Sequence, residues 1–377
     1  MRGLRRLAKR TDANNFLTES TIGVHVAHFD APWIVGCDTL EEAGLDDGGD
    51  SDATLPDLSL DPTEEPQLLS VINSSRVQAR SFFVTVGPHA LDGDGQPLRA
   101  GFARDDAGET APCVTLVLTV APRHVMDVCY LPGGAGEFGV HSDMKDVTDD
   151  VAARVQAACC GAGGEAGRRP LVRLDDAALP RYRFPLRPRE SRRAVMSSEV
   201  AASDDGGDGD GDGGGNLAAD DRAAFVCSQG MGGCFTHFMA GTRHALDFRC
   251  DVGTPVVAVA DGVVSALQHA NTASGIHVRN LFLWNSVTLR LDDGNFAEYV
   301  HIAAGSVVVA VGERVVAGQR LCDSGDVGFC PEAHLHFCVY ASGDANAPTI
   351  PFALLSAGGG SSAYVPLAGD LCQPCRI

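Results

Sequence analysis

Glycines recur at turn spacing between the short apolar runs of the chain from Ala223 to about Leu371. Glycine adopts the backbone conformations of tight turns without a steric penalty, so glycines at this spacing mark the ends of short strands. The region therefore predicts an all-β module built from tight hairpins. The glycines that carry this prediction are Gly253, Gly262, Gly275, Gly294, Gly305, Gly312, Gly318, Gly325 and Gly328.

Two further patterns lie upstream in this chain of 377 residues, which is long enough for two domains. The runs "ARSFFVTVG" and "CVTLVLTVAPRHVMDVCYL" are β-branched and partly alternating, which is typical of a small antiparallel β domain. Residues 143–160 follow Ser142, a good N-cap, and have apolar positions at helical spacing, so they predict a connecting helix. We predict a mainly β protein with a loosely ordered acidic lead-in at 1–65, a small β-rich domain at 66–135, a helical connector at 136–177 and a second β domain at 178–372.

The net charge of −20 makes nucleic acids and anionic membrane surfaces poor partners. Much of the acid lies in runs such as "SDDGGDGDGDGGG", and we predict a flexible acidic insertion at 196–221. No apolar run approaches the 18 or so residues that span a bilayer. The basic start, "MRGLRRLAKRTDANNF", lacks the apolar segment of a secretory signal peptide. The sequence leaves the oligomeric state open.

Two histidines flank one leucine in "PEAHLHFCVY", which otherwise resembles a short apolar strand. Residues two apart in a strand point to the same face, at roughly 7 Å from each other. His334 and His336 would then project side by side, with Leu335 and Phe337 on the opposite, buried face. This pattern fits a metal ligand beside a proton-transfer group, and it also fits two histidines that only pack in the structure.

Other candidate ligands precede this strand. The segment "FTHFMAGTRHALDF" contains His237, His244 and Asp247, and "FAEYVHI" contains His301. A hydrolytic zinc site uses three protein ligands from His, Asp or Glu and an open position for water, with a base and an oxyanion donor nearby. One carboxylate and several histidines can fill these roles, so the residues alone are compatible with such a site.

The order of motifs across this region resembles the lysostaphin-type, or LytM-like, zinc endopeptidases. The resemblance is carried by "HALDFRCDVGTPVVAVADGVV", "NSVTLRLDDGNFAEYVHI" and "GERVVAGQRLCDSGDVGFCPEAHLHF", and "FVCSQGMGGCFTH" is similar to the lead-in of a long-loop branch. It covers about 178–372. It implies an antiparallel β-sheet or sandwich of the lysostaphin (duplicated hybrid motif-like) type, one Zn²⁺ ion, hydrolysis of peptidoglycan stem or bridge peptides by a metal-activated water, and an extracellular or periplasmic location.

The resemblance also implies roles for individual residues. Asp247 and His336 would bind zinc, and His301 and His334 would be the catalytic histidines. The first histidine ligand is open between two positions. His244 lies three residues before Asp247, and residues at that spacing in a strand face opposite sides. We therefore favour His237, which can return through the loop "FMAGTR", and keep His244 as the alternative.

Three further residues are weaker candidates. His277 and Asn285 could line a substrate groove. Cys338 shares the strand face of the two histidines, where the resembled family usually has glutamate, so its thiol could cap the metal or simply be buried. The alternative function for the whole chain is a non-catalytic relative that binds the cell wall or activates a partner enzyme.

Overall fold

The structure is a computed structural model that describes residues 23–27, 34–45, 57–61, 63, 65–134, 138–143, 179–189, 224–233, 235–357 and 362–374. Within these residues it contains strands and one short 3₁₀ helix, η4, and no α-helix, which confirms the mainly β prediction. The same part of the chain holds no helix with the length and apolar character needed to cross a membrane. The predicted connecting helix and the predicted acidic insertion fall almost wholly on residues outside these ranges.

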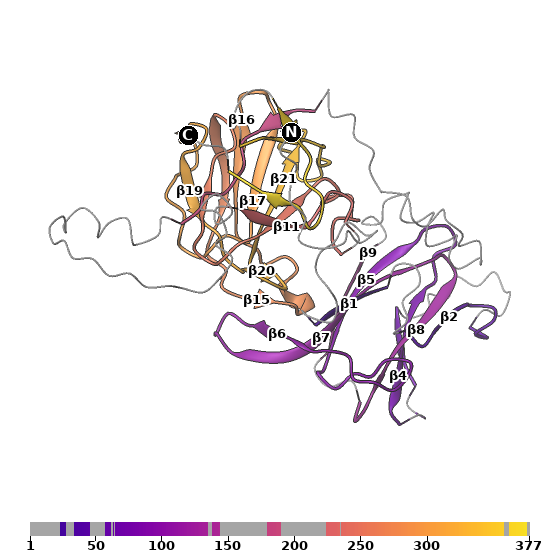
Figure 1. Cartoon of the computed structure of the whole chain (residues 1–377). Coiled ribbons are helices and arrows are strands. Elements are labelled where there is room, and N and C mark those ends of the chain that lie inside the picture. The colour runs from indigo at the N-terminus through magenta and orange to yellow at the C-terminus, as the bar shows by residue number, and fades with distance from the viewer. Residues whose placement is uncertain are drawn as a thin grey trace, which may run out of the picture.

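The N-terminal half forms two packed sheets (Figure 1). Its strands are β1 (Val24–Ala27), β2 (Gly36–Thr39), β3 (Leu58–Leu60), β4 (Gln67–Asn73), β5 (Arg80–Val86), β6 (Gly101–Arg104), β7 (Thr110–Val120), β8 (His124–Leu131) and β9 (Gly139–Asp143). One sheet has the order β2-β8-β4-β3, and the other contains β6-β7-β5-β9 with β1 paired to β7. Buried residues of both sheets, including Phe82, Leu116, Leu69 and Met126, form the core between them.

Four of these strands correct our reading of the sequence. β1, β2 and β3 lie within residues 1–65, which we predicted to be loosely ordered, and β9 begins the predicted helical connector at 136–177. Each is a run of three to five residues that pairs with a longer strand, as β1 does with residues 115–118 of β7 and β9 with residues 81–85 of β5. Such short runs gain their stability from cross-strand pairing, which local sequence patterns do not show. The domain boundaries themselves stay a prediction.

The C-terminal half contains an eight-stranded sheet of order β18-β14-β16-β17-β21-β12-β11-β24, with smaller sheets β13-β19 and β10-β22-β23 beside it. Its elements are β10 (Arg181–Tyr182), β11 (Phe225–Gln229), β12 (Leu246–Arg249), β13 (Pro255–Val257), β14 (Gly262–Gln268), β15 (Ser274–Gly275), η4 (Val278–Asn280), β16 (Ser286–Leu291), β17 (Phe296–Val300), β18 (Arg314–Val315), β19 (Arg320–Asp323), β20 (Gly328–Phe329), β21 (His334–Tyr340), β22 (Ala353–Leu355), β23 (Ala363–Tyr364) and β24 (Leu371–Cys372).

Tyr299 shows how polar groups are satisfied in the core of this half. Its ring is fully buried, and its hydroxyl accepts a hydrogen bond of 2.9 Å from the backbone N–H of Val259. Tyr299→Phe would leave that buried N–H without a partner, so we expect the free energy of unfolding to fall by about 1–3 kcal/mol. Denaturant titration of the variant measures this loss, with the partly buried Tyr130→Phe as the control. Equal midpoints for Tyr299→Phe and wild type would contradict the assigned role.

The two halves share one sheet, whose order is β20-β15-β6-β7-β5-β9 (Figure 1). β6 of the N-terminal half pairs with β15, and β15 pairs with β20 of the C-terminal half. A third apolar core lies where they meet. It contains Val24, Phe83 and Val117 from one half and Phe238, Ile276, Val278 and Phe329 from the other, and the rings of Phe83 and Phe329 meet edge to face at 5.9 Å. The N-terminal half therefore packs directly against loops of the C-terminal sheet.

Candidate metal centre

Strand pairing brings Asp247 and His336 together. β12 and β21 run antiparallel with Asp247 opposite His336, and Val300 at the end of β17 pairs with His336 from the other side. Because successive side chains alternate across a strand, Leu335 and Phe337 point into the core, where both are fully buried. The predicted division of this strand into an apolar face and a histidine face is therefore present in the structure.

His237 completes a compact group with these two residues. Its Nε2 lies 3.3 Å from Asp247 Oδ1 and 3.3 Å from His336 Nδ1, and His336 Nδ1 lies 2.9 Å from Asp247 Oδ1. The side chain of His237 is 0% exposed and that of Asp247 4%, whereas His336 is 12% exposed. The group is thus reached from the side of His336.

Hydrogen bonds hold the far side of two of these side chains. His237 Nδ1 donates to the carbonyl oxygen of Gly230 at 3.0 Å, which directs Nε2 toward the cluster. Asp247 Oδ2 accepts from Gln229 Nε2 at 2.8 Å, which leaves Oδ1 for the cluster. Burial opposes ionisation of Asp247, but the neighbouring His237 and His334 outweigh it and hold the pKa of the carboxyl well below its usual range.

This donor set fits a zinc ion. His237 Nε2 and Asp247 Oδ1 lie 3.3 Å apart, close enough for one cation to bind both atoms when the imidazole is neutral. Zinc–nitrogen and zinc–oxygen bonds of about 2.0–2.2 Å place tetrahedral ligand atoms about 3.3–3.6 Å apart, which matches the two separations of 3.3 Å in the cluster, while the third, 2.9 Å, is shorter. In zinc sites, ligand side chains are commonly oriented by a second hydrogen bond to a backbone carbonyl or a polar side chain. Here the Gly230 carbonyl binds His237 Nδ1, and Gln229 binds Asp247 Oδ2.

His301 and His334 lie beside the cluster. Their ring centroids are 4.7 Å apart, and His334 Nε2 lies 3.7 Å from Asp247 Oδ1. His301 Nδ1 donates to the carbonyl of Val327 at 2.7 Å, and His334 Nδ1 donates to the carbonyl of Glu332 at 2.7 Å. Both rings therefore keep Nε2 as the atom that can exchange a proton.

The backbone and surroundings of His301 are also unusual. Its φ is +62°, one of two positive values at non-glycine positions in the described chain, and this conformation is strained for a residue with a Cβ. Burial, followed by the neighbouring His334 and His336, holds the pKa of His301 well below its usual range. The fold thus stabilises a neutral, oriented imidazole at this position.

His244 does not join the cluster. It is partly buried, and its Nδ1 donates to the carbonyl of Thr349 at 2.8 Å. His244 precedes β12, whereas the loop after β11 carries His237 back over Asp247. Of the two histidines that sequence reasoning left open, the structure brings His237 to Asp247 and His336.

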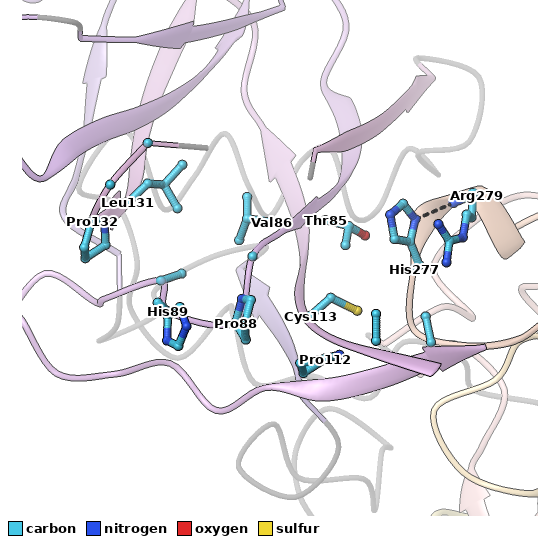
Figure 2. Close-up of a pocket in the computed structure, with 16 residues that line it drawn as sticks. Thr85, Val86, Pro88, His89, Pro112, Cys113, Leu131, Pro132, His277 and Arg279 are labelled. Atoms are coloured by element: carbon cyan, nitrogen blue, oxygen red, sulfur yellow. Dashed lines mark hydrogen bonds between the residues drawn. The ribbon is translucent and has the colours of Figure 1, made fainter. Parts of the chain in front are cut away.

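Asn285 and His277, the predicted groove residues, lie in different surroundings. Asn285 is fully buried and hydrogen bonds to the backbone of Asn271 and to the carbonyl of Ile302, so its contacts tie two loops together. His277 lies with Arg279 at one end of a cavity of about 340 Å³ between the two halves of the chain, and the N–H of Arg279 donates to His277 Nδ1 (Figure 2). A role for either residue in substrate binding stays a prediction.

Two cysteines lie close to the histidines. Cys338 is fully buried with its thiol 4.0 Å from Glu298 Oε2, and burial raises its pKa well above the usual range, so it behaves as a small buried side chain. Cys330, which sequence reasoning did not single out, has its Sγ 3.4 Å from His334 Nδ1 and forms a second group of potential ligands with His301 and His334. Its place four residues before His334 is the signal that could have indicated it.

Comparison with known proteins identifies the region that carries these residues. Residues 241–348 match the model of Peptidase family M23. This stretch, less than a third of the chain, therefore resembles an M23 peptidase domain. Asp247, His301, His334 and His336 lie inside the matched range, and His237 lies just before it.

The chain is similar to curated proteins over about 100 residues. It is 35% identical over 98 residues to the glycyl-glycine endopeptidase ALE-1 of Staphylococcus capitis, a match that covers 26% of this chain and 24% of ALE-1. It is 32% identical over 98 residues to lysostaphin of Staphylococcus simulans, covering 26% of this chain and 18% of lysostaphin. The chain thus spans about a quarter or less of the length of these relatives.

Two solved structures also match this region. The catalytic domain of lysostaphin from Staphylococcus simulans is 29% identical, covering 28% of this chain and 73% of that domain with a TM-score of 0.24. The catalytic domain of a mutant of the prophage-encoded M23 protein EnpA from Enterococcus faecalis is 24% identical, covering 29% of this chain and 75% of that domain with a TM-score of 0.24.

Proposed function

We propose that the chain is a zinc-dependent endopeptidase that hydrolyses peptide bonds in peptidoglycan stem or bridge peptides outside the cytoplasm. The observation that carries the proposal is the convergence of His237, Asp247 and His336 within hydrogen-bonding distance of one another, with His301 and His334 beside them. The M23 match and the similarity to a glycyl-glycine endopeptidase support a peptide substrate.

His237, Asp247 and His336 would hold the ion through Nε2, Oδ1 and Nδ1. Bound zinc would supply a water of lowered pKa and polarise the scissile carbonyl. A site of three protein ligands leaves room for that water and the carbonyl oxygen, as hydrolytic zinc sites require. The 12% exposure of His336 indicates the side from which a peptide would approach.

His301 and His334 would divide the proton transfer and the charge stabilisation. Each ring is fixed through its Nδ1–H by a backbone carbonyl, so each presents Nε2 toward the reaction. One would accept a proton from the attacking water and deliver it to the leaving amine, and the other, when protonated, would stabilise the oxyanion. Holding both rings in place before substrate arrives reduces the reorganisation that the reaction requires.

Metal removal tests this proposal on the full chain. Treatment with 1,10-phenanthroline is expected to abolish release of soluble fragments from purified peptidoglycan, and one equivalent of Zn²⁺ is expected to restore it. The reason is that His237, Asp247 and His336 would act only through the metal ion that they hold. Peptidoglycans with and without glycine bridges identify the bond class, and amine release measures the cleavage.

The isomer 1,7-phenanthroline, which cannot chelate one ion through both nitrogens, is the control for inhibition by the ring system itself. Full activity after the zinc has been removed would contradict the proposal. A protein that retains zinc but cleaves neither peptidoglycan nor glycyl peptides would favour the non-catalytic alternative.

A further inference from the structure

Gln229 is a neutral side chain directly behind the metal cluster, in contact with the outer oxygen of Asp247. It is the last residue of β11 and lies opposite Asp247 across the β11–β12 pairing, just after a register shift that follows Cys227. Its side chain is fully buried. Burial of a primary amide costs free energy unless its donors and its acceptor find partners, so its contacts indicate what the fold has placed it there to do.

Every hydrogen-bonding group of this amide is used. The Nε2 donates to Asp247 Oδ2 at 2.8 Å and to Thr236 Oγ1 at 2.9 Å. The Oε1 accepts from the backbone N–H groups of Phe235 at 3.1 Å, Thr236 at 2.9 Å and His237 at 3.4 Å. These partners also fix the orientation of the amide, because a flipped group would set its oxygen against the Asp247 carboxylate and its N–H₂ against three N–H donors.

One side chain thus acts on two members of the cluster at once. Occupation of Asp247 Oδ2 leaves a single oxygen, Oδ1, toward His237 and His336. The three N–H groups bound to Oε1 close the loop that returns His237 over Asp247, and the adjacent Gly230 carbonyl orients the His237 ring. Aspartate, loop and imidazole are therefore positioned by two consecutive residues.

We infer that Gln229 is a positioning residue that makes Asp247 a one-oxygen ligand and sets the place of His237. The inference rests on the proposed zinc site. Without the amide, Asp247 could present both oxygens, and three N–H groups of the loop, two of them buried, would lack their acceptor, which favours a displaced His237. The site would then bind a metal ion more weakly and present a different arrangement of protein donor atoms.

The test is metal binding by the full-length chain with Gln229→Met, which keeps the volume of the side chain and removes its hydrogen bonds. The dissociation constant for Zn²⁺, measured by competition with a chromophoric chelator, is expected to rise about 10–100-fold. The Co²⁺-loaded variant is expected to show weaker and shifted visible absorption, because tetrahedral Co²⁺ absorbs more strongly than five- or six-coordinate Co²⁺. A residue that only stabilised the fold would not change this spectrum.

Gln319→Met is the matched control. Gln319 also makes hydrogen bonds with both ends of its amide, to Glu313 Oε1 and from the Val316 N–H, but it stands in the turn before β19, outside the metal cluster. Gln229→Asn keeps an amide that is one methylene too short to reach both partners, and it serves as the second variant if Gln229→Met does not fold. In the wild type, selective ¹⁵N labelling of glutamine is expected to show one side-chain amide that shifts when Zn²⁺ is added.

The outcomes separate this inference from the proposed function. Wild type that binds Zn²⁺ while Gln229→Met or Gln229→Asn binds it equally, with an unchanged Co²⁺ spectrum, overturns the inference alone. If no glutamine side-chain amide signal of the wild type shifts when Zn²⁺ is added and bound, the inference about Gln229 is also overturned. Wild type that binds no Zn²⁺ overturns the proposed function and this inference together.

Discussion

His237→Ala is expected to lose its zinc, whereas His244→Ala is expected to keep it. Removal of His237 leaves two ligands and an empty space against the buried carboxylate of Asp247, so the dissociation constant for Zn²⁺ should rise by more than about 100-fold, beyond the range found for residues that only support a ligand. Removal of His244 costs a hydrogen bond to the Thr349 carbonyl and leaves the cluster intact. Metal analysis of the two purified variants, together with cleavage of peptidoglycan, measures the difference.

The two variants control each other because each removes one imidazole from the same 14-residue segment, "FTHFMAGTRHALDF". Far-UV circular dichroism shows whether either has lost its fold. If His244→Ala loses zinc while His237→Ala retains it, the assignment of the first ligand is wrong, although the zinc peptidase proposal stands. If His237→Ala, His244→Ala and His336→Ala all retain zinc, the metal binds outside the proposed cluster.

His301→Ala and His334→Ala are expected to separate metal binding from catalysis. Neither ring belongs to the three-residue cluster, so both variants should contain one zinc per chain. Loss of a proton-transfer or charge-stabilising group should lower kcat/KM by about 10²–10⁴-fold. The measurement is peptide cleavage under subsaturating substrate, normalised to the zinc content of each preparation.

His269→Ala is the control for these two variants, because His269 is exposed and lies outside the cluster. Unchanged kcat/KM in both His301→Ala and His334→Ala would remove their proposed roles and favour a binding module. A loss of zinc in His334→Ala alone would instead assign that ring to the metal, as its 3.7 Å distance from Asp247 allows.

The strand that carries His334 and His336 could be read from the sequence because its information is local. Alternation fixes which residues share a face, and two histidines beside Leu335 and Phe337 leave one arrangement that buries the apolar pair. The order of motifs along the chain then indicated Asp247 and His301. The mainly β fold followed in the same way from the spacing of the turn glycines.

Other features depend on contacts between distant segments, and local patterns do not specify them. Strand spacing favoured His237 over His244, but how the loop after β11 closes over Asp247 involves hydrogen bonds to Gln229 that the spacing does not show. The strand β1 is short, and its place is determined by β7, which lies far along the chain. Cys330 approaches His334 because the chain bends between β20 and β21, and its spacing of four residues from His334 does not by itself fix that bend.

The sheet shared by the two halves limits how this chain can be recombined in evolution. Many catalytic domains are exchanged between proteins as cassettes, which requires that they keep their own packing when their neighbours change. Here the segment from Ser274 to Asn280 has partners in the N-terminal half: the Ile276 N–H donates to the Phe102 carbonyl, the Val278 N–H donates to Thr85 Oγ1, and a Cβ on Gly275 would collide with Phe102. A lineage that exchanged the N-terminal half would also have to change this edge of the C-terminal half, so the two halves are expected to be inherited together.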